Sequence, residues 1–315
     1  MDNLGMKLKE GAIVRVETSS KVLFCASAYS ALGIARIFHR SGTKLSESPV
    51  VYVNSRFDML RLAEQFPEKA YQLSSLFWPG ALDLRMNSSH EIPDILNDGN
   101  SSITANMPSC PELKKLLGDA GVPLAVCEMH QGDAAPAGSA EEIEYNIDCH
   151  LPEKSTLVSF TEDPDLPLLL REGEVRKAEL EKAIGTLKEA KGLECEQHRP
   201  VRASRPITPI FVAETGSYTV SEEAGRGKIA LITFGPDKEK TGYFQVKSLS
   251  SSGDIAEAAA NFHNIMKEID RLGLDAVILE PLPECELGTQ LNERFRSVGV
   301  DVRKFGILMN QMCPD

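Results

Sequence analysis

The sequence is poor in the motifs that build disulfide frameworks and metal sites. The six histidines form no H-x-H or H-E-x-x-H motif, and no two cysteines form a C-x-x-C pair. The seven cysteines are scattered along the chain, at positions 25, 110, 127, 149, 195, 285 and 313. We therefore expect reduced thiols, a cytoplasmic location and no bound metal.

Long apolar runs and an excess of positive charge are also missing. The longest apolar stretches, such as DAVILEPL, have the length of a strand, and the start, MDNLGMKLKEG, lacks the apolar core of a signal peptide. We therefore expect no membrane partner. The formal net charge of −12 leaves no overall basic surface for nucleic acid. The 315 residues, 42% hydrophobic and 25% charged, are typical of a globular protein with about two domains.

The chain has a single tryptophan, Trp78, and a helix breaker follows it at once. In the stretch SSLFWPGALDL, Pro79 cannot continue a helix and Gly80 relaxes the turn. We therefore expect Trp78 to close a helix and to pack into a corner of the core.

Residues 1–190 alternate strand-like and helix-like segments. Periodicity predicts strands over 11–17, 49–54, 82–86, 102–107, 123–127 and 156–160. It predicts helices over 28–40, 56–77, 111–119 and 174–190. Helices interleaved with strands indicate a layered α/β domain, although periodicity does not decide which strands pair.

Residues 191–208 form a predicted linker, rich in proline and poor in large apolar side chains. Arg199, Arg202 and Arg205 make it the most basic patch of an acidic chain. Both a solvated connector and a strap that contacts an anion or RNA fit this composition. The acidic remainder of the chain disfavours the RNA contact.

Residues 209–315 form a second predicted α/β unit. Strand patterns fall at 209–213, 228–234, 243–249 and 275–282, and a helix pattern at 287–297. The helix over 254–273 has an apolar face, with Asp254 as N-cap and Gly273 just beyond its end. The order of elements indicates a small Rossmann-like domain without a nucleotide-binding motif.

Several fragments, in order along nearly the whole chain, resemble the motifs of one family. FWPGALDL (77–84) resembles F-W-P-G-P-L-T-L, and GVPLAVCEMHQGDAAP (121–136) resembles G-x-P-L-A-A-P-S-A-N-x-S-G. Similar matches cover ARIFHRSG, SSITANMP, STLVSF with LLREGEV, RPVRASRPITP and AAANFHNIMKEIDRLGLDAVILEPLPECELGTQLNERF. These are motifs of the threonylcarbamoyl-AMP synthase family in its two-domain form.

The resemblance implies both a fold and an activity. The fold is a YrdC-like α/β domain (1–190), the linker (191–208) and a smaller Rossmann-like α/β domain (209–315). Family members are nucleotidyltransferases that join L-threonine, bicarbonate and ATP, with magnesium, into threonylcarbamoyl-AMP for tRNA modification. The W-P-G turn is scaffold in this family, which agrees with a packing role for Trp78.

The resemblance also places candidate ligand-binding residues in this sequence. They are Thr18, Ser20, Lys44, Tyr52, Ser102, Ser155, Arg171 and Arg205. Thr18, Ser155 and Arg171 match family positions, and Arg205 matches the linker pattern. Lys44 lies one residue beyond the family's K-G-R cation pair, and Tyr52 replaces a histidine. No catalytic residue is assigned.

Five further family positions carry a different residue: Ser41, Thr43, Asn106, Glu128 and His130. Ser41 and Thr43 stand where the family has the lysine and arginine of K-G-R, and Asn106 replaces another arginine. Glu128 and His130 replace residues of S-A-N, and Glu128 brings a carboxylate to the expected path of the ATP phosphates. Three lost cations remove roughly 4–9 kcal/mol of binding free energy, because each charged hydrogen bond contributes roughly 1.5–3 kcal/mol.

These replacements favour a degenerate, weakly active or non-catalytic paralogue that binds a small molecule in its N-terminal domain. The alternative is an active synthase with a rearranged ATP loop around Lys44. Glu128, His130 and Asp133 could instead form a new acid–base or metal cluster, although solvated loop residues explain such spacing more often. Lys21 and Lys44 could likewise line a pocket for a smaller anion.

Overall fold

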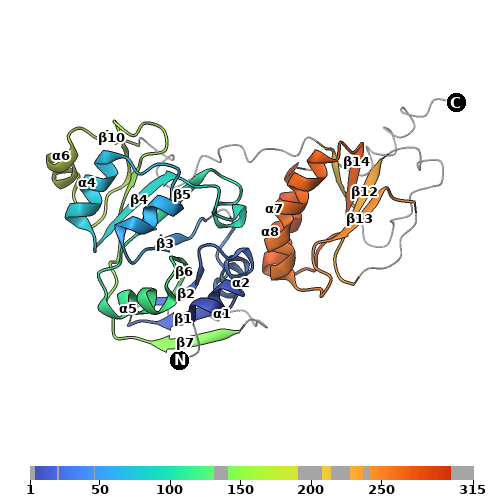
Figure 1. Cartoon of the computed structure of the whole chain (residues 1–315), viewed down its shortest axis with the longest axis horizontal. Coiled ribbons are helices and arrows are strands. Elements are labelled where there is room, and N and C mark those ends of the chain that lie inside the picture. The colour runs from blue at the N-terminus through green and yellow to red at the C-terminus, as the bar shows by residue number, and fades with distance from the viewer. Residues whose placement is uncertain are drawn as a thin grey trace. The chain divides into compact units, whose positions relative to one another are not determined.

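The computed structural model describes residues 4–19, 21–45, 47–130, 141–190, 208–213, 228–236 and 242–298. The chain divides into two compact units, Met1–Ala203 and Ser204–Asp315, each with a sheet of its own (Figure 1). The predicted linker lies outside the described residues except for Thr208. Its boundaries and the role of Arg205 therefore stay predictions.

A mixed sheet of ten strands forms the frame of the first unit, in the order β10-β9-β8-β4-β5-β3-β6-β2-β1-β7. The strands are β1 (Ile13–Glu17), β2 (Lys21–Ser27), β3 (Val50–Tyr52), β4 (Leu82–Asn87), β5 (Ser102–Asn106), β6 (Leu124–His130), β7 (Glu142–Asn146), β8 (Thr156–Ser159), β9 (Leu168–Arg171) and β10 (Lys188–Glu189). All six predicted strands are confirmed, as β1, β3, β4, β5, β6 and β8. The other four were not predicted.

The helices of this unit pack on the sheet and on one another. They are α1 (Leu4–Lys9), α2 (Ala31–Ser41), the 3₁₀ turn η1 (Arg56–Asp58), α3 (Met59–Leu62), α4 (Glu68–Phe77), the 3₁₀ turn η2 (Asp94–Asn97), α5 (Pro111–Ala120) and α6 (Lys177–Ile184). The Ser30 hydroxyl caps α2 by accepting from the Gly33 N–H at 3.2 Å, and Ile34, Ile37 and Phe38 of α2 are buried. The predicted helices 28–40 and 111–119 are confirmed.

Two predicted helices are longer than those observed. The segment 56–77 breaks because Ala63 is extended and bridges Ser88, and because Pro67 precedes the new start of α4. The segment 174–190 yields only α6, because Gly185 ends it at a φ of +82°. Residues 188–189 then pair with β9.

The turn after α4 confirms the packing role of Trp78. The residue is 8% exposed, and its indole Nε1–H donates to the Leu82 carbonyl oxygen at 2.6 Å. The Trp78–Pro79 peptide bond is cis. A Cβ on Gly80 would lie 2.5 Å from the Phe77 carbonyl oxygen, so this turn requires glycine.

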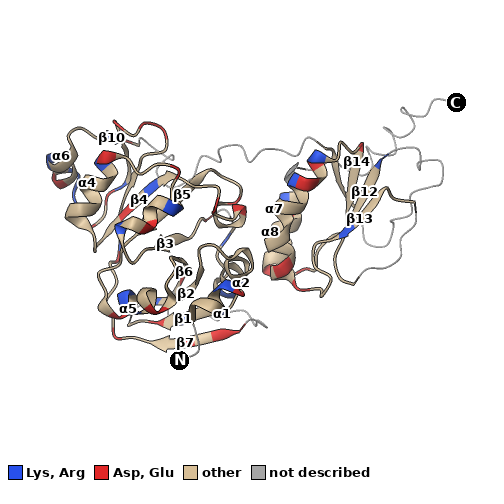
Figure 2. Cartoon of the chain, viewed as in Figure 1, with Lys and Arg blue, Asp and Glu red and all other residues tan. Residues whose placement is uncertain are grey.

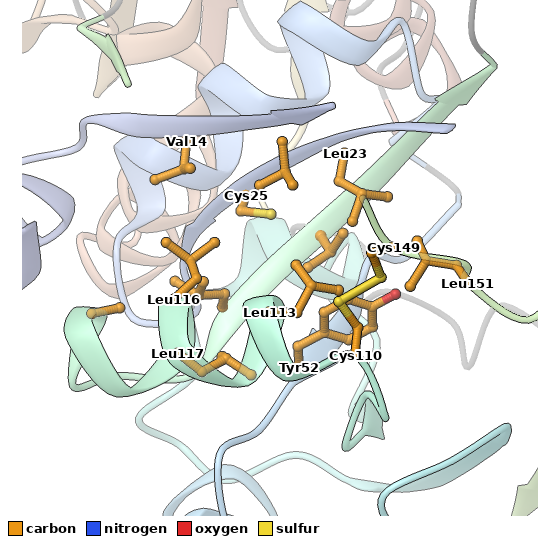
Figure 3. Packing of buried hydrophobic residues seen from close by; sticks show 14 of the residues in the cluster. Val14, Leu23, Cys25, Tyr52, Cys110, Leu113, Leu116, Leu117, Cys149 and Leu151 are labelled. Atoms are coloured by element: carbon orange, nitrogen blue, oxygen red, sulfur yellow. A yellow bond between two sulfur atoms is a disulfide. The ribbon is translucent and has the colours of Figure 1, made fainter. Parts of the chain in front are cut away.

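A hydrophobic cluster fills the space between the sheet and α5. Leu113, Leu116 and Leu117 of α5 pack with side chains from β1 and β2 (Figure 3). At its edge, Cys110 and Cys149 form a disulfide. The expectation of reduced thiols is therefore wrong for this pair. Tertiary structure brings the start of α5 to the segment after β7, and spacing in the sequence carries no sign of it.

In its described residues the second unit consists of a parallel sheet and two helices. Its order is β11-β14-β12-β13. The elements are β11 (Ile210–Val212), β12 (Ile229–Thr233), β13 (Gln245–Ser248), β14 (Ala276–Leu279), α7 (Ile255–Arg271) and α8 (Glu286–Val298). Asp254 caps α7 by accepting from the backbone N–H groups of Ala256 and Glu257 at 2.7 and 3.2 Å. The two helices meet at Phe262 and Phe295, whose ring centroids lie 4.9 Å apart. The predicted Rossmann-like pattern is confirmed.

Candidate ligand site

A cavity of about 380 Å³ lies in the first unit, beside the ends of its central strands. Segments 47–50, 108–109 and 151–155 complete its walls. The volume falls in the range of small-molecule sites, roughly 300–1,000 Å³. Seven candidate site residues from the sequence line it: Lys21, Thr43, Tyr52, Asn106, Glu128, Ser155 and Arg171.

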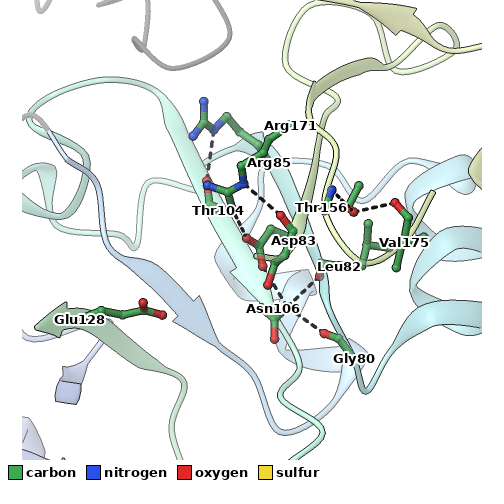
Figure 4. A network of polar contacts seen from close by, with 12 residues as sticks. Gly80, Leu82, Asp83, Arg85, Thr104, Asn106, Glu128, Thr156, Arg171 and Val175 are labelled. Atoms are coloured by element: carbon green, nitrogen blue, oxygen red, sulfur yellow. Dashed lines mark hydrogen bonds and ion pairs between the residues drawn. The ribbon is translucent and has the colours of Figure 1, made fainter. Parts of the chain in front are cut away.

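A buried carboxylate, Asp83, joins neighbouring strands at the wall of this cavity. Arg171 Nη2 lies 3.0 Å from Asp83 Oδ2, and Asn106 Nδ2 donates to Asp83 Oδ1 at 2.9 Å (Figure 4). Register explains the contact, because Leu157 of β8 pairs with Asp83 on one side and with Arg171 on the other. Residues distant in sequence therefore meet in one row across the sheet.

The amide nitrogen of Asn106 donates to the backbone and to this carboxylate. Its Nδ2 also lies 3.1 Å from the Gly80 carbonyl oxygen and 2.9 Å from that of Leu82. The side chain of Asn106 is buried. The residue that replaces a family arginine thus serves the W-P-G turn and Asp83, and it offers no charge to a ligand.

Burial raises the pKa of Asp83 to about 6, although Arg171 and the hydrogen bond from Asn106 act in the opposite direction. The Glu128 carboxylate adds to the rise, and the Arg85 guanidinium opposes it. The side chain of Asp83 is only 6% exposed, so the loss of hydration outweighs its favourable contacts. Burial likewise lowers the pKa of Arg85 to about 10.

A second ion pair crosses the cavity wall from β2 to β6. Lys21 Nζ lies 2.6 Å from Glu128 Oε2. The same carboxylate acts on the neighbouring Tyr52, whose pKa is raised well above its usual range, mainly by burial and then by Glu128 and Asp83. Glu128 therefore neutralises a cation on this side of the cavity, as Asp83 does on the other.

The charges that line the cavity nearly balance. Three cations face four carboxylates: Lys21, Lys154 and Arg171 against Glu47, Asp83, Glu128 and Glu153. Along the ribbon of the first unit, Lys and Arg positions are interspersed with Asp and Glu positions (Figure 2). A cavity with this balance does not attract a polyphosphate by charge.

The loop after α2 presents hydroxyls where the family resemblance leads us to expect cations. Ser41 Oγ donates to Thr43 Oγ1 at 2.7 Å, and the Thr43 N–H donates back to Ser41 Oγ at 3.2 Å. Gly42 turns the chain between them, with a φ of +66°. Lys44 is exposed and is not among the residues that line the cavity.

The remaining candidate residues either do not line the cavity or lie outside the described residues. Thr18 closes the turn between β1 and β2, where its Oγ1 donates to the Lys21 carbonyl oxygen at 2.8 Å. Ser102 begins β5 opposite Asn87. Neither is among the residues that line the cavity. Four candidates lie outside the described residues, wholly or in their side chain: Ser20, His130, Asp133 and Arg205.

Backbone packing holds the segment 151–155 against Arg171. The Ser155 carbonyl oxygen accepts from Arg171 Nε at 2.9 Å, and the Glu174 N–H donates to the Lys154 carbonyl oxygen at 3.1 Å. A Cβ on Gly173 would lie only 2.2 Å from that Lys154 oxygen. The close approach therefore requires glycine at this position.

Sequence reasoning missed Asp83, the central group of the site. A signal was present, because FWPGALDL has this aspartate where the family motif F-W-P-G-P-L-T-L has threonine. Its meaning depends on Arg171, which lies 88 residues further along the chain. The replacement of threonine by Asp83 becomes informative only when the contact with Arg171 is known.

Curated proteins that resemble this chain match it over most of its length. A model described as "Telomere recombination", covering Sua5, YciO and YrdC proteins, matches residues 6–173. The threonylcarbamoyl-AMP synthase of Bacillus subtilis is 23% identical over 316 residues, which cover 91% of this chain and 89% of that protein. The threonylcarbamoyl-AMP synthase of Pyrococcus abyssi is 25% identical over 321 residues, which cover 92% and 91%.

Solved structures confirm the predicted fold class. A variant of P. abyssi Sua5 superposes with a TM-score of 0.52 at 22% identity, covering 94% of this chain and 93% of that one. P. abyssi Sua5 complexed with L-threonine gives a TM-score of 0.51 at 22% identity, with coverages of 93% and 92%. No helix among the described residues has the length and apolar character needed to cross a membrane.

Proposed function

The chain belongs to the Sua5/YciO/YrdC family, and from that premise we propose that it is a degenerate threonylcarbamoyl-AMP synthase. It binds a small molecule in the cavity of its first unit, with little or no synthase turnover. The solved complex of P. abyssi Sua5 with L-threonine makes an amino acid the first ligand to test. We place the protein in the cytoplasm, and we do not favour an RNA contact through the basic linker.

One observation carries this proposal: carboxylates of the chain itself engage two of the cations of the cavity. Arg171 is paired with Asp83, and Lys21 is paired with Glu128. A triphosphate would have to displace both carboxylates, or bind beside them against their charge. Cations that would compensate are replaced by Ser41 and Thr43, which bond to each other.

The binding free energy lost with the three family cations supports weak ATP binding. Three missing charged hydrogen bonds amount to roughly 4–9 kcal/mol, at roughly 1.5–3 kcal/mol each. At about 1.4 kcal/mol per decade, this corresponds to about three to six orders of magnitude in affinity or rate. Lys154, whose side chain is exposed, does not replace three fixed cations.

The alternative is an active synthase that uses Lys44. It is favoured by two of the retained family residues, Ser155 and Arg171, which line the same cavity. In this case the loop after α2 would rearrange on binding and bring Lys44 to the triphosphate. The two functions differ in turnover, which makes them easy to distinguish.

The deciding experiment combines a thermal shift with an assay of pyrophosphate release. We expect millimolar Mg–ATP to leave the melting temperature unchanged, because stabilisation vanishes when Kd exceeds the ligand concentration. We also expect no pyrophosphate release that depends on both L-threonine and bicarbonate. Release that requires both substrates, and that Lys44→Ala abolishes, would establish the active synthase instead.

Restoring the family residues provides the positive control. We expect Ser41→Lys, Thr43→Arg, Asn106→Arg, Glu128→Ser and His130→Asn, combined with Asp83→Thr, to create measurable ATP binding. The matched control carries the first five changes and keeps Asp83. It should bind more weakly by about 1.5–3 kcal/mol, the contribution of one charged hydrogen bond to Arg171. Circular dichroism of both variants checks that they fold.

A further inference from the structure

Arg171 presents unused hydrogen-bond donors to the cavity. Its Nε donates to the Ser155 carbonyl oxygen and its Nη2 to Asp83, which leaves further N–H groups of the five on a guanidinium. The side chain of Arg171 is 40% exposed, whereas that of Asp83 is 6% exposed. A ligand therefore meets the guanidinium first, and the carboxylate lies behind it.

We propose that Asp83 is a built-in competitor for Arg171, so that this end of the cavity binds a small oxyanion when Asp83 is neutral and excludes it when Asp83 is ionised. The oxyanion is a carboxylate, sulfate or phosphate group, since a guanidinium fork matches these groups geometrically. This inference rests on the proposed function in one respect: the cavity is the ligand site of the chain.

The structure holds Asp83 in the position of a competitor. One carboxylate oxygen is fixed by Asn106 Nδ2 at 2.9 Å, which leaves the other directed at Arg171 at 3.0 Å. The Asp83 carboxylate therefore occupies the place on Arg171 that a bound anion would take. Loss of the negative charge would free the guanidinium and leave its position unchanged, because Ser155 also holds it.

The charged and titratable groups around Asp83 come from four strands. Arg171 lies on β9 and Arg85 on β4, whereas Glu128 on β6 and Tyr52 on β3 face it from the other side. Burial and Glu128 raise the pKa of Asp83 to about 6, against the two arginines. Neutralisation therefore begins close to neutral pH, where an exposed aspartate stays ionised.

Sulfate is the probe, because its charge is constant between weakly acidic and neutral pH. Titration calorimetry at constant ionic strength compares the full-length protein with Asp83→Asn, an isosteric change that removes the charge. At about pH 7.5 we expect Asp83→Asn to bind sulfate at least about tenfold more tightly than the unmodified protein, the effect of one freed charged hydrogen bond. Arg171→Gln in the Asp83→Asn background should abolish this gain.

Asp119→Asn is the matched control, because Asp119 is exposed on α5 and is not among the cavity residues. It makes the same change of net charge and should leave sulfate binding unaltered. An equal gain in Asp119→Asn, no gain in Asp83→Asn, or a gain that survives Arg171→Gln would each overturn the proposal.

The unmodified protein supplies a second test that does not depend on the folding of a variant. Between about pH 7.5 and about pH 5 its sulfate affinity should rise by about tenfold or more, as Asp83 takes up a proton. Equal affinity at both pH values would also overturn the proposal. The outcome is separate from that of the proposed function, which is tested by ATP binding and by synthase turnover.

Discussion

Trp78 and Asp83 lie five positions apart on one stretch of chain, and both are buried, yet they are stabilised in opposite ways. Trp78 buries an apolar ring, and its single donor is satisfied by the Leu82 carbonyl oxygen. Asp83 buries a charge whose pKa shows that its partners do not fully replace water. The W-P-G turn that contains Trp78 keeps the family residues, whereas the wall that contains Asp83 has changed them. Apolar packing thus preserves the fold while the chemistry of the cavity diverges.

The largest expected effect concerns the turn. We expect Trp78→Ala to lower the free energy of unfolding by about 3–5 kcal/mol, because a large cavity replaces the indole. Urea unfolding followed by circular dichroism measures the change. Trp78→Phe keeps most of the ring and should lose much less. An unchanged unfolding midpoint for Trp78→Ala would show that the turn does not depend on this packing.

The next effect concerns the wall and depends on pH. The pKa of Asp83 rises from its ordinary value of 3.8 to about 6 on folding, so the folded state binds the proton more tightly than the unfolded state. The contribution of Asp83 to stability is therefore fully present below about pH 4 and is lost as pH rises through about 6, a change of about 3 kcal/mol for about two pKa units. Asp83→Asn should remove this change.

Urea midpoints measured at several pH values, for the unmodified protein and for Asp83→Asn, test this sign. The difference between the two curves isolates Asp83 from the other titrating groups. A difference that does not vary between about pH 4 and about pH 7 would mean that the carboxylate is as well stabilised when folded as in water.

The smallest effect concerns Asn106, which links the turn to the wall. Asn106→Ala removes the donor that serves Gly80, Leu82 and Asp83. Leu82 keeps its bond from Trp78, so we expect a loss of only about 1–3 kcal/mol, for the acceptors left unsatisfied. The midpoint of the Asp83 titration should also move to higher pH, because the bond from Asn106 favours the ionised form.

The shift in the Asp83 titration is measurable as a displacement, along the pH axis, of the step in the free energy of unfolding. Asn106→Asp is unsuitable as a control because it adds a second carboxylate. Asn97→Ala offers a better comparison, since Asn97 is a buried asparagine whose Nδ2 donates to Ser88 Oγ at 3.2 Å. If Asn106→Ala lost stability but the pH-dependent step stayed at the same pH, Asn106 would support the W-P-G turn without influencing Asp83.

Local pattern was sufficient for much of the fold. The six predicted strands of the first unit and the capped helix α7 follow from alternation, apolar periodicity and an N-cap aspartate, all of which act over a few residues. The unpredicted β7 and β9 have mixed burial and depend on their neighbours, with β7 paired to β1 and β9 to β8. Their pairing is decided by the sheet and has no local signal.

The sequence by itself determined the class of fold, the packing role of Trp78 and the positions at which family cations are absent. Those properties depend on residue type and on local spacing. Only the tertiary structure decided that Asp83 faces Arg171, that Lys21 faces Glu128 and that Cys110 meets Cys149. Each of these contacts joins residues from distant parts of the chain through strand register or helix placement. Electrostatic and covalent partners depend on distance in space, and a single sequence records only distance along the chain.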